Sequence, residues 1–303
     1  MKFEVTILGC GSATPTLRHW PTSQLVNHDE HYFLFDCGEG AQLQLRRYNI
    51  KFQQINHLFI THLHGDHCLG LPGLLSTMHL LGRTKDLNIY ANAALQEAIE
   101  IQLRVSYSRL RFQLKWHPLS YDEPQIIMEN AKLQVMSFPL NHRVPCCGFR
   151  ISEKPKPRNM IPQMIEKYTI PFVRIRQIKA GADYILEDGT VIPNADLTLD
   201  PAEPKSYAFC TDTAFAEKTI DAVQGVDLLY HEATFLEKDR QRAYDTFHST
   251  ASDAARVANM AGVGKLILGH FSARYHDLNP FLEEAESVFK PVVLANEGLC
   301  FKV

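Results

Sequence analysis

Short apolar runs separated by turn-forming residues dominate the first half of the chain. Buried strands read as continuous apolar runs, and half-buried strands alternate between apolar and polar positions, so both patterns predict strands here. The predicted strands are residues 4–8, 32–35, 58–60 and 133–138. Apolar positions with helical spacing predict helices at residues 70–81 and 93–105, which would cover a sheet.

The second half repeats this strand and helix theme. Strands are predicted at residues 207–210, 227–230 and 265–268, and helices at residues 216–223 and 252–261. No sequence repeat of fixed period is present, which excludes a solenoid. The pattern therefore predicts a mixed α/β fold.

Residues 151–206 have a different character, because seven prolines interrupt any long element. Seven lysines and arginines face only two glutamates between residues 153 and 179. This composition predicts an inserted basic arm. It suits a partner with a phosphate backbone, since neutralised phosphates release counterions, but an ordinary solvated loop remains open on these residues alone.

Metal-ligand side chains are concentrated just after the predicted strand at residues 58–60. His62, His64, Asp66 and His67 lie within six residues. Imidazole and carboxylate ligands suit Zn²⁺, and the absence of cysteine among them favours an open catalytic site over a closed structural one. The alternative is a surface turn that happens to be rich in histidine.

Composition narrows the protein class. The 303 residues are 45% hydrophobic and 21% charged with a net charge of -3, which allows a large globular domain and excludes a globally basic surface. No run approaches the ~20 apolar residues that span a bilayer, and the chain opens on a strand-like run instead of a leader. Seven scattered cysteines without a CxxC pair predict buried reduced thiols and a cytoplasmic location.

The segment at residues 9–14, Gly-Cys-Gly-Ser-Ala-Thr, begins like a dinucleotide-binding fingerprint. It lacks the third glycine, and Pro15 follows where a helix should open. A tight turn is the better prediction.

The pattern HxHxDH at residues 62–67 is that of the metallo-β-lactamase fold, and further motifs make the chain resemble the ribonuclease Z family of tRNA 3′-processing endonucleases. The matching segments are residues 8–15, 35–40, 141–142, 148–150, 211–213, 231–235, 248–250 and 269–275. The resemblance implies one α/β domain over residues 1–303, an αββα sandwich in which residues 151–206 are an inserted tRNA-binding arm.

The resemblance also implies two Zn²⁺ ions per subunit. The ligands of one ion are His62, His64 and His142, those of the other are Asp66, His67 and His270, and Asp212 bridges the two. Independently of the resemblance, His142, Asp212 and His270 each follow a strand-like run, where α/β sheets gather ligands.

A two-metal centre suits phosphodiester hydrolysis. The resemblance implies that Asp66 accepts a proton, that His248 is the general acid for the departing 3′-oxygen, and that Glu232 orients His248. The alternative for His248 is a structural residue ahead of a helix that Ser249 and Ser252 cap.

Precursor tRNA is the implied substrate, read by shape and phosphate contacts. The candidate substrate-binding residues are Lys154, Lys156, Arg158, Arg174, Arg176 and Arg18. Many family members read Pro-x-Lys-x-Arg-Asn after the first strand, but residues 15–20 lack that lysine and asparagine, which leaves trailer preference open. The family is usually homodimeric, and the helix at residues 70–81, with Met78 and Leu80, is either an interface or core.

Three alternatives compete with this function. A metallo-β-lactamase-fold hydrolase of small phosphodiesters or other esters needs the same seven ligands, but has no use for a basic arm. An RNA-binding scaffold with a degenerate fold predicts an incomplete site, whereas every expected ligand is present. A redox diiron member of the fold would carry a carboxylate in place of a histidine ligand.

Overall fold

The computed structural model describes residues 2–303, which form two compact units. The first unit comprises the chain up to Glu129 together with Val135–Ile151 and Lys205–Val303. The second unit comprises Asn130–Gln134 and Ser152–Pro204.

A seven-stranded sheet with the order β18-β1-β2-β3-β4-β5-β6 forms one half of the first unit. Its strands are β1 (Phe3–Gly9), β2 (Ser23–His28), β3 (His31–Phe35), β4 (Ile55–Phe59), β5 (Leu87–Ala91), β6 (Leu114–Pro118) and β18 (Cys300–Lys302). The strands predicted at residues 4–8, 32–35 and 58–60 are confirmed as β1, β3 and β4. Strands β3 and β4 pair in parallel, so both carboxyl ends meet at one edge of the sheet.

A second seven-stranded sheet has the order β17-β16-β15-β14-β9-β8-β7. Its strands are β7 (Gln125–Glu129), β8 (Leu133–Pro139), β9 (Cys147–Glu153), β14 (Ser206–Cys210), β15 (Leu228–Glu232), β16 (Leu266–Gly269) and β17 (Val292–Leu294). The four strands predicted in this part of the chain are confirmed as β8, β14, β15 and β16. Strands β14 to β17 run parallel.

The inner faces of the two sheets meet in a layer of aromatic rings. Phe35 lies 5.6 Å from Phe149 and 6.0 Å from Phe209 between ring centroids, and Phe59 lies 5.4 Å from Phe149. All four side chains are buried, so aromatic packing joins strands that are far apart in sequence.

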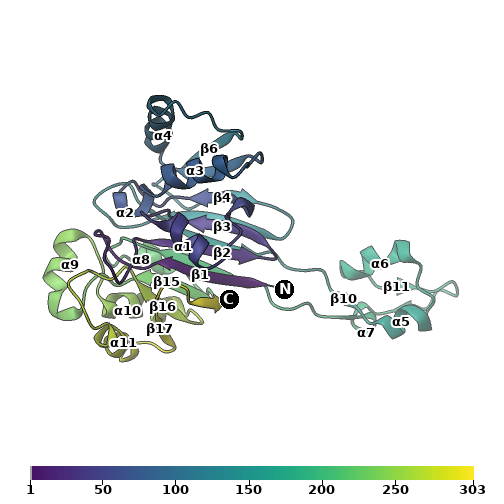
Figure 1. Ribbon diagram of the computed structural model, residues 1–303. Coiled ribbons are helices and arrows are strands. Elements are labelled where there is room, and N and C mark those ends of the chain that lie inside the picture. Colours follow the sequence, from purple (N-terminus) through teal and green to yellow (C-terminus); the bar gives the residue numbers. More distant parts are fainter. Residues whose placement is uncertain (1) are drawn as a thin grey trace. The chain divides into compact units, whose positions relative to one another are not determined.

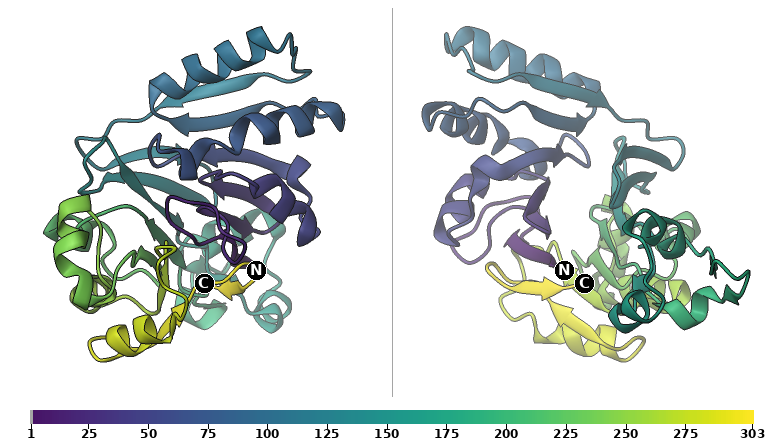
Figure 2. Two further views of the ribbon diagram at one scale, coloured as in Figure 1. Left: turned by 60° about the vertical axis from the view of Figure 1, so that its left-hand side comes forward. Right: turned by 90° about the vertical axis from the view of Figure 1, so that its right-hand side faces the viewer.

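Helices cover the outer faces, which confirms the expected αββα sandwich (Figure 2). The first sheet carries α1 (Ala41–Arg47), α3 (Leu71–Leu80) and α4 (Ala93–Val105), and the second carries α8 (Glu217–Ala222), α10 (Ala251–Ala261) and α11 (Asn279–Glu286). The four predicted helices are confirmed as α3, α4, α8 and α10. Thr250, not Ser249 or Ser252, caps α10, because its side chain accepts from the Asp253 backbone in a capping box.

The second unit holds three short helices and two antiparallel strand pairs, labelled in part in Figure 1. These are β10 (Asn159–Met160) with β13 (Thr198–Leu199), β11 (Tyr184–Ile185) with β12 (Val191–Ile192), and helices α5 (Pro162–Lys167), α6 (Phe172–Lys179) and α7 (Asn194–Leu197). A small core of Ile170, Ile178, Ile192 and Leu197 stabilises it. Residues 152–204 are therefore an ordered unit and not an irregular loop.

Two further sequence expectations bear on the fold. No helix within residues 2–303 is long and apolar enough to cross a bilayer. No helix follows β1, in line with the predicted tight turn. Gly9 is needed there because a Cβ atom would lie 1.8 Å from the Pro21 carbonyl oxygen.

Candidate metal centre and active site

The ends of parallel strands gather the candidate ligands at one edge of the sandwich. His62 and His64 follow β4, and the four-residue helix α2 (Gly65–Cys68) carries the next two ligands of the HxHxDH turn. Asp212 follows β14, and His270 follows β16 directly. The two sheets therefore bring together ligands separated by up to 208 residues.

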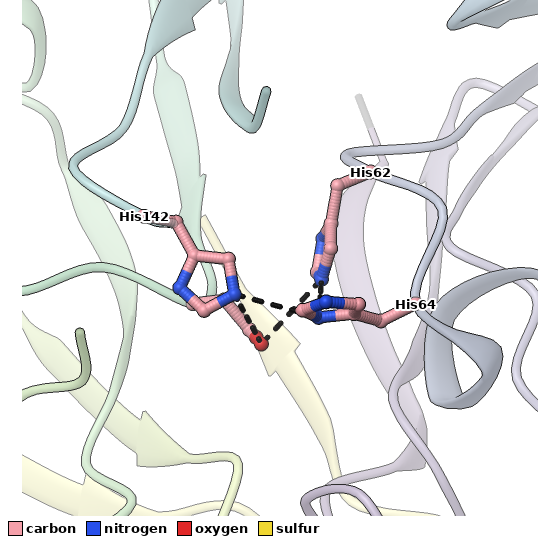
Figure 3. Close-up of side chains that lie close together, drawn as sticks. His62, His64 and His142 are labelled. Carbon is pink, nitrogen blue, oxygen red and sulfur yellow. Dashed lines mark hydrogen bonds and ion pairs between the residues drawn. The ribbon is translucent and has the colours of Figure 1, made fainter. Parts of the chain in front are cut away.

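The first cluster contains His62, His64, His142 and Asp212, whose ligand atoms all lie within 4.8 Å of one another. Figure 3 shows the three imidazoles converging from two different loops. His64 Nδ1 lies 2.9 Å from His62 Nε2 and 3.4 Å from His142 Nε2. A metal ion placed between these nitrogen atoms would bind their lone pairs, so the geometry fits a metal site.

The second cluster contains Asp66, His67 and His270. The Asp66 Oδ2 atom lies 3.3 Å from His67 Nε2 and 3.5 Å from His270 Nε2. Within residues 2–303 both of these nitrogen atoms are buried and have no hydrogen-bond partner. Buried polar atoms are rarely left unpaired, and a metal ion would satisfy them.

Asp212 lies between the two clusters and turns one carboxylate oxygen to each. Its Oδ2 atom lies 3.6 Å from His62 Nε2, and its Oδ1 atom lies 3.2 Å from His67 Nε2 and 3.0 Å from His270 Nε2. Only 3% of this side chain is exposed. Burial raises the pKa of Asp212, but the surrounding imidazoles outweigh burial and hold its pKa well below the usual range.

Neighbouring groups fix which nitrogen of each histidine faces the centre. His67 Nδ1 lies 2.7 Å from Asp36 Oδ2, and His142 Nδ1 lies 3.1 Å from the Phe247 carbonyl oxygen. With Nδ1–H donated to these acceptors, the Nε2 lone pair is free for a metal. His270 Nδ1 lies 2.9 Å from the Thr234 hydroxyl, which holds this ring in the same way.

His248 and Glu232 form a buried pair beside both clusters. His248 Nδ1 lies 2.7 Å from Glu232 Oε1, and its ring lies 5.5 Å from that of His270 between centroids. Backbone N–H groups of Thr213 and Thr234 also donate to Glu232, at 2.9 Å each, so this carboxylate is held firmly. Burial lowers the pKa of His248, but the charge and hydrogen bond of Glu232 outweigh burial and raise it to about 9.

A pocket of about 420 Å³ opens onto these groups. Asp66, Asp212, His248 and His270 line it together with Arg143. It is large enough for a phosphodiester group. Ala13, which also lines the pocket, contacts the second cluster directly, because its backbone N–H donates to Asp66 Oδ2 at 2.7 Å.

The structure brings together the residues that the sequence predicted as metal ligands, but the sequence did not point to the residues that orient them. Asp36, Thr61 and Thr234 are buried and follow strand ends, yet their types are too common to single out. Cys146 was expected to be a buried thiol; it is buried, and its Sγ atom also lies 3.6 Å from His62 Nδ1. Arg143 was not considered, although it directly follows the ligand His142.

The candidate substrate-binding residues of the arm lie in the second unit, and two of them pair with acidic side chains. Lys156 donates to Glu153 Oε2 at 2.7 Å, and Arg158 pairs with Asp200. Basic and apolar side chains together line a groove of about 740 Å³ in this unit. The side chains that matter for its chemistry are Lys156, Arg158, Arg176, Lys179, Phe172 and Ile175.

The other substrate-binding candidates lie as follows. Arg174 lies on α6 and donates to Gln177 Oε1 at 3.2 Å. The Lys154 backbone N–H donates to the Lys132 carbonyl oxygen at 2.8 Å. Arg18 belongs to the first unit and donates to the His276 carbonyl oxygen at 3.2 Å, so part of its guanidinium group is occupied.

Comparisons with known proteins agree with this architecture. The family model of the anti-Pycsar protein Apyc1 matches residues 3–155, and that of the beta-lactamase superfamily domain matches residues 166–271. The chain is 46% identical over 302 residues to the ribonuclease Z of Bacteroides fragilis (strain YCH46), covering 100% of this chain and 99% of the relative. It is 47% identical over 298 residues to the ribonuclease Z of Phocaeicola vulgatus, covering 98% and 96%. The crystal structure of human tRNase Z, short form, superposes with a TM-score of 0.72 at 26% identity and covers 98% of each chain.

The fold and the His/Asp clusters define a metallo-β-lactamase-type hydrolase. The sequence identity with the bacterial relatives, which extends over nearly the whole chain, identifies the family more specifically than the fold does. The chain belongs to the ribonuclease Z family and is an endoribonuclease, a hydrolase of phosphodiester bonds.

Proposed function

We propose that this enzyme removes the 3′ trailer from precursor tRNA with the help of two Zn²⁺ ions, leaving a 3′-hydroxyl on the tRNA and a 5′-phosphate on the trailer. The observation that carries the proposal is Asp212, whose two oxygens face two separate groups of ligand atoms. The names of the relatives support the substrate class.

The residues present fit the proposed metals. His62, His64 and His142 would hold one ion, Asp66, His67 and His270 the other, and Asp212 both. Within residues 2–303, the Nε2 atoms of His67 and His270 are buried and make no hydrogen bond, which supports this assignment. When bound, two such ions supply Lewis acidity that activates water and steadies the oxygens of an in-line phosphoryl displacement.

His248 is proposed to give a proton to the departing 3′-oxygen. Its raised pKa, about 9, keeps the ring protonated at neutral pH, and it lines the pocket. Glu232 touches no part of the pocket itself and acts by holding His248 Nδ1 at 2.7 Å, which leaves Nε2–H free to donate.

Asp66 is proposed to accept a proton during attack on phosphorus. It lines the pocket, and the nearby His67 and His270 outweigh burial and hold its pKa below the usual range, so it is ionised at neutral pH. A carboxylate of low pKa is a weak base, so it would hold the proton only briefly before passing it to solvent.

The arm at residues 151–206 is proposed to bind tRNA away from the cleavage site. Basic side chains along the groove, with exposed Phe172 at its edge, suit a structured RNA that is recognised by shape and phosphates. Because Glu153 pairs with Lys156 and Asp200 pairs with Arg158, most of the attraction should come from other basic side chains of the arm, such as Arg174 and Arg176.

The function is tested by cleavage of a 3′-extended precursor tRNA with metal-analysed protein, beside a chromogenic phosphodiester. A single cut next to the discriminator base, abolished by Asp212→Ala, is the expected result. Hydrolysis of the small ester alone would instead favour a small-phosphodiester hydrolase and remove the RNA role of the arm.

We also propose a cytoplasmic homodimer. Seven free cysteines, six of them buried, support a reducing compartment. Of the two α3 residues considered for an interface, Met78 is fully buried in the core, whereas Leu80 is 76% exposed and remains available. Light scattering coupled to gel filtration, with Leu80→Lys as the variant, tests the dimer.

A further inference from the structure

A third group of metal-ligand side chains lies apart from the two clusters described above. It consists of Cys10, directly after β1, His19 in the following loop, and Glu297 between β17 and β18. Their ligand atoms lie within 4.8 Å of one another. We propose that this triad binds an additional divalent metal ion, Zn²⁺ by its ligand types.

The distances between the donor atoms are close to those of a zinc site. Cys10 Sγ lies 3.4 Å from His19 Nδ1 and 3.7 Å from Glu297 Oε1, and His19 Nδ1 lies 3.1 Å from Glu297 Oε2. Ligands about 2.0 to 2.3 Å from a tetrahedral zinc are separated by about 3.3 to 3.8 Å from one another. The triad thus needs only small side-chain adjustments to close around an ion.

Charge and burial also suit a divalent cation. Cys10 is fully buried, and only 7% of the Glu297 side chain is exposed. A thiolate and a carboxylate together balance a 2+ ion, so the bound site would carry no net charge into the interior. His19 is 24% exposed, which leaves a fourth coordination position within reach of solvent.

Without a metal, the same groups can only form a hydrogen-bonded lock. The Cys10 thiol would donate to the Ala295 carbonyl oxygen at 3.6 Å, and His19 Nδ1–H would donate to Glu297. A thiol is a weak hydrogen-bond donor, so the fully buried Cys10 would add little stability to this hydrogen-bonded arrangement. The two arrangements differ in one measurable respect, because only metal binding makes Cys10 a thiolate ligand.

The position of the triad gives the ion a role. The loop at residues 11–20 is closed by a hydrogen bond between its ends, in which Gly11 N–H donates to the Trp20 carbonyl oxygen at 2.9 Å. Trp20 N–H in turn donates to Glu297 Oε1 at 2.8 Å. The same loop carries Ala13, which holds Asp66 and lines the pocket. A metal ion bound where this loop closes would hold this wall of the active site in place.

Cobalt substitution of the full-length protein tests the inference. The clusters at the pocket supply only imidazole and carboxylate ligands, so thiolate-to-cobalt charge-transfer absorption in the near ultraviolet would report the triad alone. We expect this absorption in the wild-type protein titrated with Co²⁺, and its loss in Cys10→Ser. Elemental analysis should also find one zinc fewer per chain in Cys10→Ser than in the wild-type protein.

The matched control is Cys37→Ser, because Cys37 is as fully buried as Cys10 but belongs to none of the groups of metal-ligand side chains. This variant should keep both the absorption and the full zinc content. Absence of thiolate absorption in the wild-type protein overturns the inference without any need for a variant, and so does absorption that Cys10→Ser retains. Cleavage of precursor tRNA is measured separately, so failure of this site leaves the proposed function untouched.

Discussion

Replacing Asp36 by asparagine should weaken metal binding even though Asp36 touches no proposed metal. Asp36 is fully buried, and its carboxylate accepts from the Thr61 backbone N–H at 2.8 Å and from His67 Nδ1–H at 2.7 Å. Asparagine has one oxygen for these two donors. If that oxygen stays with Thr61, the new NH₂ group faces His67 Nδ1 and favours the tautomer that carries its proton on Nε2.

The expected loss follows from that tautomer. A proton on His67 Nε2 blocks the lone pair directed at the second cluster, so binding there must first reverse the tautomer. Loss of a residue that orients a ligand costs about 10- to 100-fold in metal affinity, which corresponds to about 1.4 to 2.7 kcal/mol. The cost should fall on the ion held by Asp66, His67 and His270, and leave the other ion nearly unaffected.

Competition with a chelator of known zinc affinity measures the effect directly. Asp227→Asn is the control, because Asp227 accepts from the Ser206 backbone N–H and hydroxyl and pairs with Lys205, but contacts no proposed ligand. The melting temperature of metal-free protein separates lost affinity from lost stability. If Asp36→Asn binds both zinc ions as tightly as Asp227→Asn does, the tautomer argument is wrong.

Three further predictions concern catalysis, substrate binding and pH. His248→Ala should lower turnover of precursor tRNA by about 10²- to 10⁴-fold with full zinc content, and should affect a chromogenic ester less, because its good leaving group needs no general acid. Arg174→Gln with Arg176→Gln should raise KM for precursor tRNA and flatten its salt dependence by about one unit of slope per lost phosphate contact, while hydrolysis of the small ester stays unchanged. Burial lowers the pKa of His57 to about 4, so the unfolded chain is protonated first on acidification. The free energy of unfolding should therefore fall by up to about 3 kcal/mol between about pH 6.5 and 4. A His57→Phe variant, which keeps the ring against Tyr90, should lose that part of the acid sensitivity in urea titrations at both pH values.

Local patterns in the sequence predicted most of the scaffold and four of the candidate metal ligands. The turn at residues 62–67 places four ligands together with few backbone dihedral angles between them, so its geometry depends little on distant contacts. Strongly periodic segments such as α4 (Ala93–Val105) were equally predictable, because their apolar face requires a partner sheet. Strands too short to show a period, such as β17 and β18, were not predicted.

Only the tertiary structure decided which common residues orient and modulate those ligands. Asp36 lies 31 residues from His67, and Glu297 lies 278 residues from His19, so no local spacing links either pair. The structure also showed that the arm presents less positive charge than its basic segment suggests. Arg158 pairs with Asp200, which lies outside the basic segment at residues 153–179. Sequence spacing governs geometry only within a turn or an element, whereas contacts between distant segments depend on how the whole core packs.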